Sequence, residues 1–238
     1  AWLSINVKNP KFADEKVRRA IQYALDVSQI MEGSYSGLAA PATGVVPPAL
    51  VGHRDQILYP ADAAKAQALL EEAGVSGLTV ELAAQNDKTS QLTCQIIQAL
   101  LGAVGITVDI KNYDDGVYWT LGDKSSGETW KTLELVLMNF AGGVDPSENL
   151  TWFRPSQIGV YNWSQFDSPE FEALYQQGMA ETDQDKRAGI YRKMQDLMEK
   201  SGGFVFITHE TFAAVVRKGL KPSIMADGYL DMTRFAKS

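Results

Sequence analysis

Residues 77–113, GLTVELAAQNDKTSQLTCQIIQALLGAVGITVDIKNY, decide the fold class of this chain. The two ends of this stretch, GLTVELAA (77–84) and GITVDIKNY (105–113), show strand patterns, and apolar residues recur at helical spacing between about 90 and 103. A strand, a helix and a strand in this order form a βαβ unit, whose strands run parallel through a right-handed crossover. The sequence therefore predicts an α/β fold in which the carboxyl ends of these strands lie at one edge of the sheet.

Helices and strands with the same kinds of signal continue on both sides of this unit. Residues 14–30 predict one amphipathic helix with Asp14 as its N-cap, and residues 61–74 predict a second helix that starts at Asp62. Later elements are expected at residues 133–140, 168–180, 185–200, 204–208 and 211–217. Residues 37–60 show no sustained period and are too long for an ordinary connection, so they are expected to pack on the surface or to have a function.

Two loops follow strands at the predicted edge of the sheet, QNDKT (85–89) and AGGVDPSENL (141–150). Loops at this edge are where α/β proteins hold their ligands. The candidate ligand contacts lie in and beside these loops and in the aromatic run that follows: Gln85, Asn86, Asp87, Lys88, Asn139, Phe140, Ala141, Gly142, Gly143, Asp145, Trp152 and Trp163.

Asp145 has the residue type of a catalytic carboxylate, but its neighbours favour a helix cap. In DPSE, Asp145 can cap the helix, Pro146 fits the first helical position, and Glu148 can reach back to the cap. The amide groups of this helix start would also favour a carboxylate or another anion on a ligand. The preceding Gly142 and Gly143 permit either a close approach of the backbone to a ligand or a plain turn.

The segment TWFRPSQIGVYNWSQF (151–166) is unusually dense in aromatic residues. Aromatic side chains with polar tips often line small-molecule pockets, although they fill cores more often. We expect one or two of these rings to face a cleft and the others to belong to the core.

Composition and motif searches exclude several classes of function. The chain has 238 residues, 45% of them hydrophobic, and its net charge of −7 without a basic stripe argues against nucleic-acid binding. The longest apolar stretches are well short of the roughly 20 residues that span a bilayer. Cys94 is the single cysteine, and neither His53 nor His209 has metal-ligand spacing. Hydrolase, P-loop and dinucleotide motifs are absent, so no catalytic residue, metal or cofactor is predicted.

Six segments in order resemble motifs of the bacterial extracellular solute-binding proteins of family 5, the peptide- and nickel-binding components of ABC importers. The segments are FADEKVRRAIQYALD, DAAKAQALLEEAG, GITVDI, DPSENL, NWSQFDSPEFEAL and TDQDKRAGIYRKMQDLMEK. They cover nearly the whole chain. The resemblance implies a noncatalytic lobe of the periplasmic-binding-protein type, with a mixed sheet and a βαβ unit flanked by helices.

Members of this family are about twice as long and close two lobes on a ligand. By this resemblance, residues 1–210 are lobe II and residues 211–238 return to lobe I, while the first lobe and a signal peptide would precede Ala1. The implied function is capture of an oligopeptide-like, opine-like or sugar-like solute in the periplasm and its delivery to membrane permeases by a monomeric protein. The alternatives are an enzyme, or a peptide-sensing or chaperone-like module, that reuses the same lobe.

The resemblance also bears on the kind of solute. In peptide-binding members, an aspartate three residues before the Asp-Pro pair holds the terminal ammonium of the ligand, and this sequence has Gly142 at that position. The QNDKT loop also lacks an arginine. We therefore expect backbone groups of residues 141–144 to contact a sugar-like, opine-like or modified-peptide ligand rather than a plain dipeptide.

Overall fold

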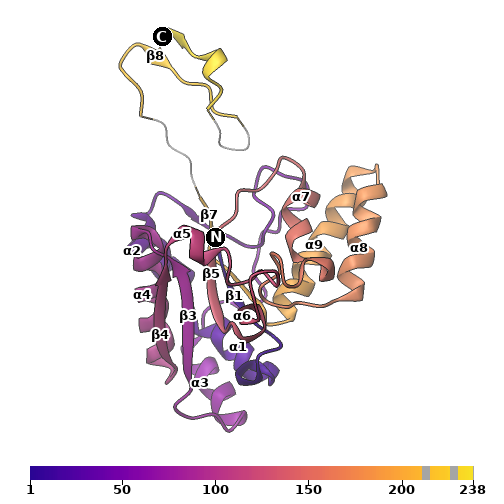
Figure 1. Cartoon of the computed structure of the whole chain (residues 1–238). Helices are drawn as coiled ribbons and strands as arrows, with labels where there is room; N and C mark the ends of the chain where they lie inside the picture. Colours follow the sequence, from indigo (N-terminus) through magenta and orange to yellow (C-terminus); the bar gives the residue numbers. More distant parts are fainter. Residues whose placement is uncertain (211–214, 226–229, 238) are drawn as a thin grey trace.

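The predicted βαβ unit forms one side of the central sheet (Figure 1). Strands β3 (Thr79–Gln85) and β4 (Thr107–Tyr113) pair in parallel along their whole length, and helix α4 (Lys88–Ala103) connects them. The structure is a computed structural model that describes residues 1–210, 215–225 and 230–237.

Five strands form this sheet in the order β4-β3-β5-β1-β6. Strand β5 (Leu135–Met138) runs parallel to β3, whereas β1 (Trp2–Ile5) runs antiparallel to both β5 and β6 (Phe204–Phe206). The sheet is therefore mixed, as the family resemblance implies. Four strands end at the same edge of the sheet, and β1 begins at that edge.

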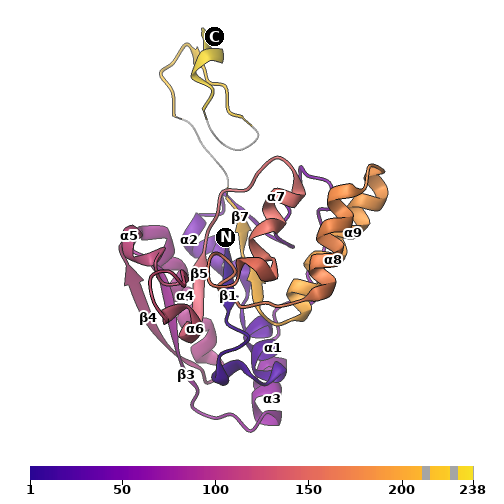
Figure 2. The same ribbon diagram turned by 45° about the vertical axis from the view of Figure 1, so that its right-hand side comes forward.

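The apolar side chains of the central strands alternate between the two faces of the sheet. Both faces are therefore covered, by helices or by aromatic segments. One face carries Leu3, Leu82 and Leu137, which pack with buried residues of helices α1–α4. The other face carries Met138 and Phe206, which pack with the two C-terminal helices and the aromatic run. The helices not yet given bounds are α1 (Glu15–Ala24), α2 (Val27–Tyr35), α3 (Ala63–Glu72), α8 (Pro169–Ala180) and α9 (Gln184–Lys200). Figure 2 shows α8 and α9 side by side, away from α2, α3 and α4.

Short elements connect these layers. The helical ones are α5 (Asp115–Tyr118), α6 (Thr129–Thr132) and α7 (Pro146–Leu150), with 3₁₀ turns at Pro10–Phe12, Thr151–Phe153, Pro155–Gln157 and Met232–Arg234. The extended ones are the pair β2 (Ala40–Pro41) and β7 (Thr208–His209), and the hairpin β8 (Leu220–Lys221) and β9 (Ala236–Lys237).

The structure has two helices where one is expected over residues 14–30. The single helix over residues 14–30 is wrong, because the backbone of Leu25 is extended and Asp26 caps a separate helix, α2, by accepting a hydrogen bond from Ser28 N (3.0 Å). Leu25 itself is buried in the core. Of the strand expected over residues 211–217, residues 211–214 lie outside the described part of the chain.

Candidate functional site

A cavity of about 460 Å³ lies at the carboxyl edge of the sheet, over β5, β1 and β6. Five parts of the chain form its wall: the start of β1, the loop at residues 44–47, the segment after β5, the region of α7, and the chain from β6 to Glu210. The lining residues are Ala1, Trp2, Gly44, Val45, Pro47, Asn139, Phe140, Ala141, Gly142, Gly143, Asn149, Trp152, Phe153, Phe206, Thr208, His209 and Glu210.

The structure brings half of the predicted site residues together in this cavity. The residues that line it are Asn139, Phe140, Ala141, Gly142, Gly143 and Trp152. The residues placed outside it are Gln85, Asn86, Asp87, Lys88, Asp145 and Trp163. The loop after β5 therefore meets the cavity, and the loop after β3 does not.

The loop after β3 makes contacts within its own side of the sheet instead. Gln85 Nε2 donates a hydrogen bond to Asp115 Oδ1 (2.6 Å), and Asn86 Nδ2 donates to Asp114 Oδ1 (3.2 Å). Asp87 caps α4 by accepting from Ser90 N (3.0 Å). These polar side chains hold the ends of β3 and β4 together.

The two predicted tryptophans have different environments. The side chain of Trp163 is 2% exposed, and its Nε1 donates to the carbonyl oxygen of Val160 (2.8 Å). Trp152 lines the cavity, and its buried Nε1 has no hydrogen-bond partner. Of the two, Trp163 is a core residue, and Trp152 lies at the cavity.

Asp145 caps α7, as one of the two sequence interpretations predicts. Its carboxylate accepts hydrogen bonds from Ser147 N (2.9 Å) and from Arg187 (2.9 Å), and Glu148 completes a capping box. Burial raises the pKa of the Asp145 carboxyl, but these hydrogen bonds outweigh it, so the pKa lies below its ordinary value. The expected binding of a ligand anion at this helix start is not supported, because the chain's own carboxylates already occupy it.

Close packing explains the glycines that precede this helix. A side-chain carbon on Gly142 would overlap the Oδ1 atom of Asn149, and one on Gly143 would overlap the carboxylate of Glu148. Asn149 in turn donates from Nδ2 to the carbonyl oxygen of Gly143 (3.2 Å). An aspartate at position 142 would therefore require the Asn149 side chain to move.

Aromatic rings form much of the cavity wall. The ring of Phe140 lies 5.4 Å from that of Trp2 and 5.8 Å from that of Trp152, and it stacks on Trp119 at 5.3 Å. Tyr161 packs against Trp152 at 4.9 Å. The wall thus offers apolar and aromatic surface.

Several residues that line this cavity have a side-chain nitrogen atom without a hydrogen-bond partner. Among the described residues, five buried side-chain polar atoms lack a hydrogen-bond partner, and three of these belong to cavity residues: Trp2 Nε1, Trp152 Nε1 and His209 Nε2. Buried polar groups in folded proteins are nearly always paired. Burial also lowers the pKa of His209 to about 4, so this ring is neutral at physiological pH. Side chains with unpartnered polar atoms are therefore concentrated among the residues that line the cavity.

Several lining residues escape the sequence analysis. Trp2, Thr208 and His209 come from strands that reach this edge only through pairing with distant segments. Glu210 supplies a carboxylate that no local motif marks, and Asn139 Nδ2 donates to its Oε1 atom (2.8 Å). The absence of an acidic side chain at position 142 therefore does not leave the cavity without a carboxylate.

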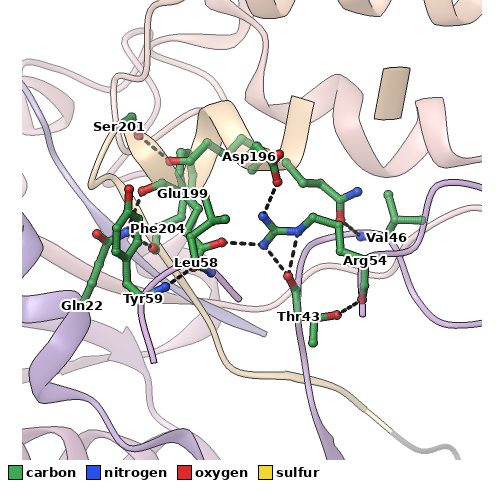
Figure 3. A network of polar contacts seen from close by, with 12 residues as sticks. Gln22, Thr43, Val46, Arg54, Leu58, Tyr59, Asp196, Glu199, Ser201 and Phe204 are labelled. Carbon is green, nitrogen blue, oxygen red and sulfur yellow. Dashed lines mark hydrogen bonds and ion pairs between the residues drawn. The ribbon is translucent and has the colours of Figure 1, made fainter. Parts of the chain in front are cut away.

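Helix α9 fixes the wall formed by residues 44–47 through a buried ion pair (Figure 3). The guanidinium of Arg54, 5% exposed, lies 2.6 Å from Glu199 Oε2 and 2.8 Å from Asp196 Oδ1. Arg54 also donates from Nε to the carbonyl oxygen of Thr43 (2.9 Å), and Glu199 Oε1 accepts from Leu58 N (2.8 Å). Thr43 and Leu58, at the two ends of the loop 43–58, are thereby tied to α9.

Gln195, one helical turn before Glu199, holds the same loop at its middle. Its Oε1 accepts from Val46 N (3.1 Å), and its Nε2 donates to the carbonyl oxygen of Gly52 (2.9 Å). A side-chain carbon on Gly44 would overlap the Gln195 Oε1 atom. Within the long segment without periodicity, Gly44, Val45 and Pro47 therefore form a packed wall of the cavity.

Two other features bear on function. Burial raises the pKa of Cys94 to about 12, which keeps the thiol protonated and unreactive. Across residues 1–210, 215–225 and 230–237, no three side chains gather as a metal site, and no helix has the length and apolar character needed to cross a bilayer.

We expect Asp145→Ala to lower the free energy of unfolding by about 0.5–2 kcal/mol, because the cap is lost. Asp145→Asn should cost less, since asparagine also caps helices but cannot pair with Arg187. Because its pKa is lowered in the folded protein, the Asp145 carboxylate stabilises the fold at pH values above the ordinary carboxyl pKa of 3.8. The difference in free energy of unfolding between wild type and Asp145→Asn should therefore shrink as the pH falls below about 4. Urea unfolding at several pH values measures this, and equal losses at pH 3 and 7 would contradict it.

Arg54→Met should lower the free energy of unfolding by about 3–5 kcal/mol, because it leaves Glu199 buried without its cation. Lys16→Met is the matched control, since the Lys16–Glu72 pair (3.1 Å) is exposed and should contribute less than about 1 kcal/mol. Denaturant unfolding of both variants tests the difference. Equal losses would show that the buried pair does not hold the loop.

Comparison with known proteins supports the architecture. Residues 1–159 match the family described as bacterial extracellular solute-binding proteins, family 5 middle region. The dipeptide-binding protein of Escherichia coli (strain K12) is 30% identical over 231 residues, which cover 92% of this chain and 42% of that protein. The glutathione-binding protein GsiB of Salmonella paratyphi A is 28% identical, with 92% and 44% covered.

A solved structure shows the same fold. The periplasmic binding protein DppA of Helicobacter pylori, in complex with the peptide STSA, superposes with a TM-score of 0.77 at 28% identity, covering 87% of this chain and 40% of that one. The chain spans less than half the length of these curated relatives. It belongs to the bacterial extracellular solute-binding proteins of family 5, which are binding proteins and not enzymes.

Proposed function

We propose that this chain is the second lobe of the substrate-binding component of an ABC importer and that the cavity at the edge of its sheet receives the solute. The observation that carries the proposal is the set of unpartnered nitrogens on Trp2, Trp152 and His209 in one cavity. Such groups form hydrogen bonds when a ligand enters and displaces water. The relatives named above, which bind dipeptides, glutathione and a peptide, support a small solute of this general kind.

We further propose that residues 1–210 form lobe II and that residues 211–238 return to lobe I. Figure 1 shows the hairpin of β8 and β9 apart from the body that contains the sheet. This hairpin exposes apolar side chains, among them Met232, which is 69% exposed. Apolar side chains in so short a hairpin are consistent with packing against another lobe. In the proposed protein, the two lobes close on the solute by a hinge motion.

The place and the partners of the protein follow from the same proposal. An importer of this family captures its solute in the periplasm and delivers it to permease subunits in the membrane. Permease subunits are therefore the proposed protein partners. The solute class stays open between oligopeptide-like, opine-like and sugar-like compounds, because one lobe supplies only part of the contacts.

The test of the cavity compares the two tryptophans in the full-length protein. Mass spectrometry first identifies the solute that copurifies with it, and calorimetry then measures its affinity. Trp152→Phe removes an unpartnered N–H from the wall and should weaken binding about three- to tenfold with little change in melting temperature. Trp163→Phe removes a hydrogen bond inside the core and should lower the melting temperature but leave affinity within about twofold. The opposite pattern would refute the proposed cavity.

The isolated 238-residue chain should bind the same solute far more weakly than the full-length protein does. A cleft between two lobes draws part of its contacts from each wall, and burial of most of a small ligand requires both. Calorimetry on the two proteins under the same conditions measures the difference. Equal affinities would contradict the two-lobed arrangement.

A further inference from the structure

The charged side chains on the cavity wall are of one sign only. Among the described residues that line it, Glu210 is the only one with a charged side chain at neutral pH, and no lysine or arginine is present. His209, the other titratable lining side chain, is neutral because burial lowers its pKa to about 4. The wall therefore carries a single negative charge next to aromatic rings.

The neighbours of Glu210 hold its carboxylate without neutralising it. Asn139 Nδ2 donates to Oε1 (2.8 Å), and the hydroxyl of Tyr35 lies 3.5 Å from the same atom. Neither group carries a positive charge, and no ion pair of the described side chains includes Glu210. The amine of Ala1 donates to the carbonyl oxygen of Thr208 (2.6 Å). In the proposed two-lobed protein, that nitrogen is an uncharged amide.

Closure of a second lobe over this wall would remove water from the carboxylate. A carboxylate that loses water without gaining a cation is strongly disfavoured, so the occupant itself has to provide the positive charge. Trp2, Phe140 and Trp152 also line this wall, and aromatic rings attract cations and repel anions at their faces. The indole N–H groups add a second requirement, since a donor-only group needs an oxygen acceptor on the ligand.

We propose that Glu210 determines the charge specificity of this lobe, which accepts a solute through an ammonium or guanidinium group beside Glu210 and through uncharged oxygen atoms at the indole N–H groups. Solutes with an anionic group at this position are rejected. The inference rests on the proposed function, because it assigns chemistry to the same cavity. It departs from the sequence-based expectation of a sugar-like, opine-like or modified-peptide ligand, which rested on Gly142 at the position of the family's aspartate.

The experiment pairs a change of charge on the protein with a change of charge on the ligand. Four probes are titrated calorimetrically into the full-length protein at pH 7: alanyl-alanine, alanyl-alanine amide, N-acetyl-alanyl-alanine and N-acetyl-alanyl-alanine amide. The variant is Glu210→Gln, which retains an oxygen for Asn139 and removes the charge. Glu170→Gln, at an exposed position in the first turn of α8, is the matched control.

The wild type should bind the two free amines at least about tenfold more tightly than their acetylated forms, since a desolvated charge pair commonly contributes that much. Glu210→Gln should abolish this preference by weakening the free amines about tenfold while leaving the acetylated forms within about twofold. Glu210→Asp, which keeps the charge, should retain part of the preference even if Glu210→Gln lowers the melting temperature. Glu170→Gln should behave as wild type.

Three results would overturn the inference. These are an unchanged preference in Glu210→Gln, an equal loss for free and acetylated probes, and a wild-type protein that binds none of the four probes. The solute-binding proposal would survive each of them, because it is tested separately by the copurified solute and the two tryptophan variants. A failure of that second test would overturn both.

Discussion

The pairing of β1 between β5 and β6 is the constraint on which the site depends. Trp2 lies opposite Met138 on one side and Phe206 on the other. Because β1 runs against its neighbours, its first residues lie where the other strands end. Segments from the start, the middle and the far end of the body therefore meet at one edge of the sheet. A shift of one residue in this register would turn Trp2 away from the cavity.

The cavity wall is set in place by polar contacts within the protein rather than by apolar packing alone. Gln195 and Glu199, on one face of α9, hold the loop that carries Gly44 and Val45 at several backbone groups. Asn149 holds the segment of Gly142 and Gly143 in the same way. Both segments have glycine where a side chain of the neighbouring helix approaches the backbone. Such preorganisation reduces the conformational entropy that a ligand would otherwise have to overcome.

The chemistry of the wall is asymmetric, and this is a physical basis for selectivity. Indole nitrogens only donate hydrogen bonds, a carboxylate only accepts them, and the aromatic rings between them provide contact area with little conformational freedom to lose. A ligand must match both kinds of group to leave neither unpaired. Discrimination of this sort is strong because a buried polar group without a partner is costly.

Local signals determined much of this protein. The βαβ unit, the caps at Asp14, Asp62 and Asp145, and the covered sheet are readable from the sequence, since periodicity and capping act between residues a few positions apart. Tertiary structure alone decided that Trp152 lines the cavity while Trp163 lies in the core. It also decided that Glu210 stands beside Asn139 although 71 positions separate them. Such contacts arise from strand order and register, which depend on burial of the whole sheet and leave no mark in the sequence around either residue.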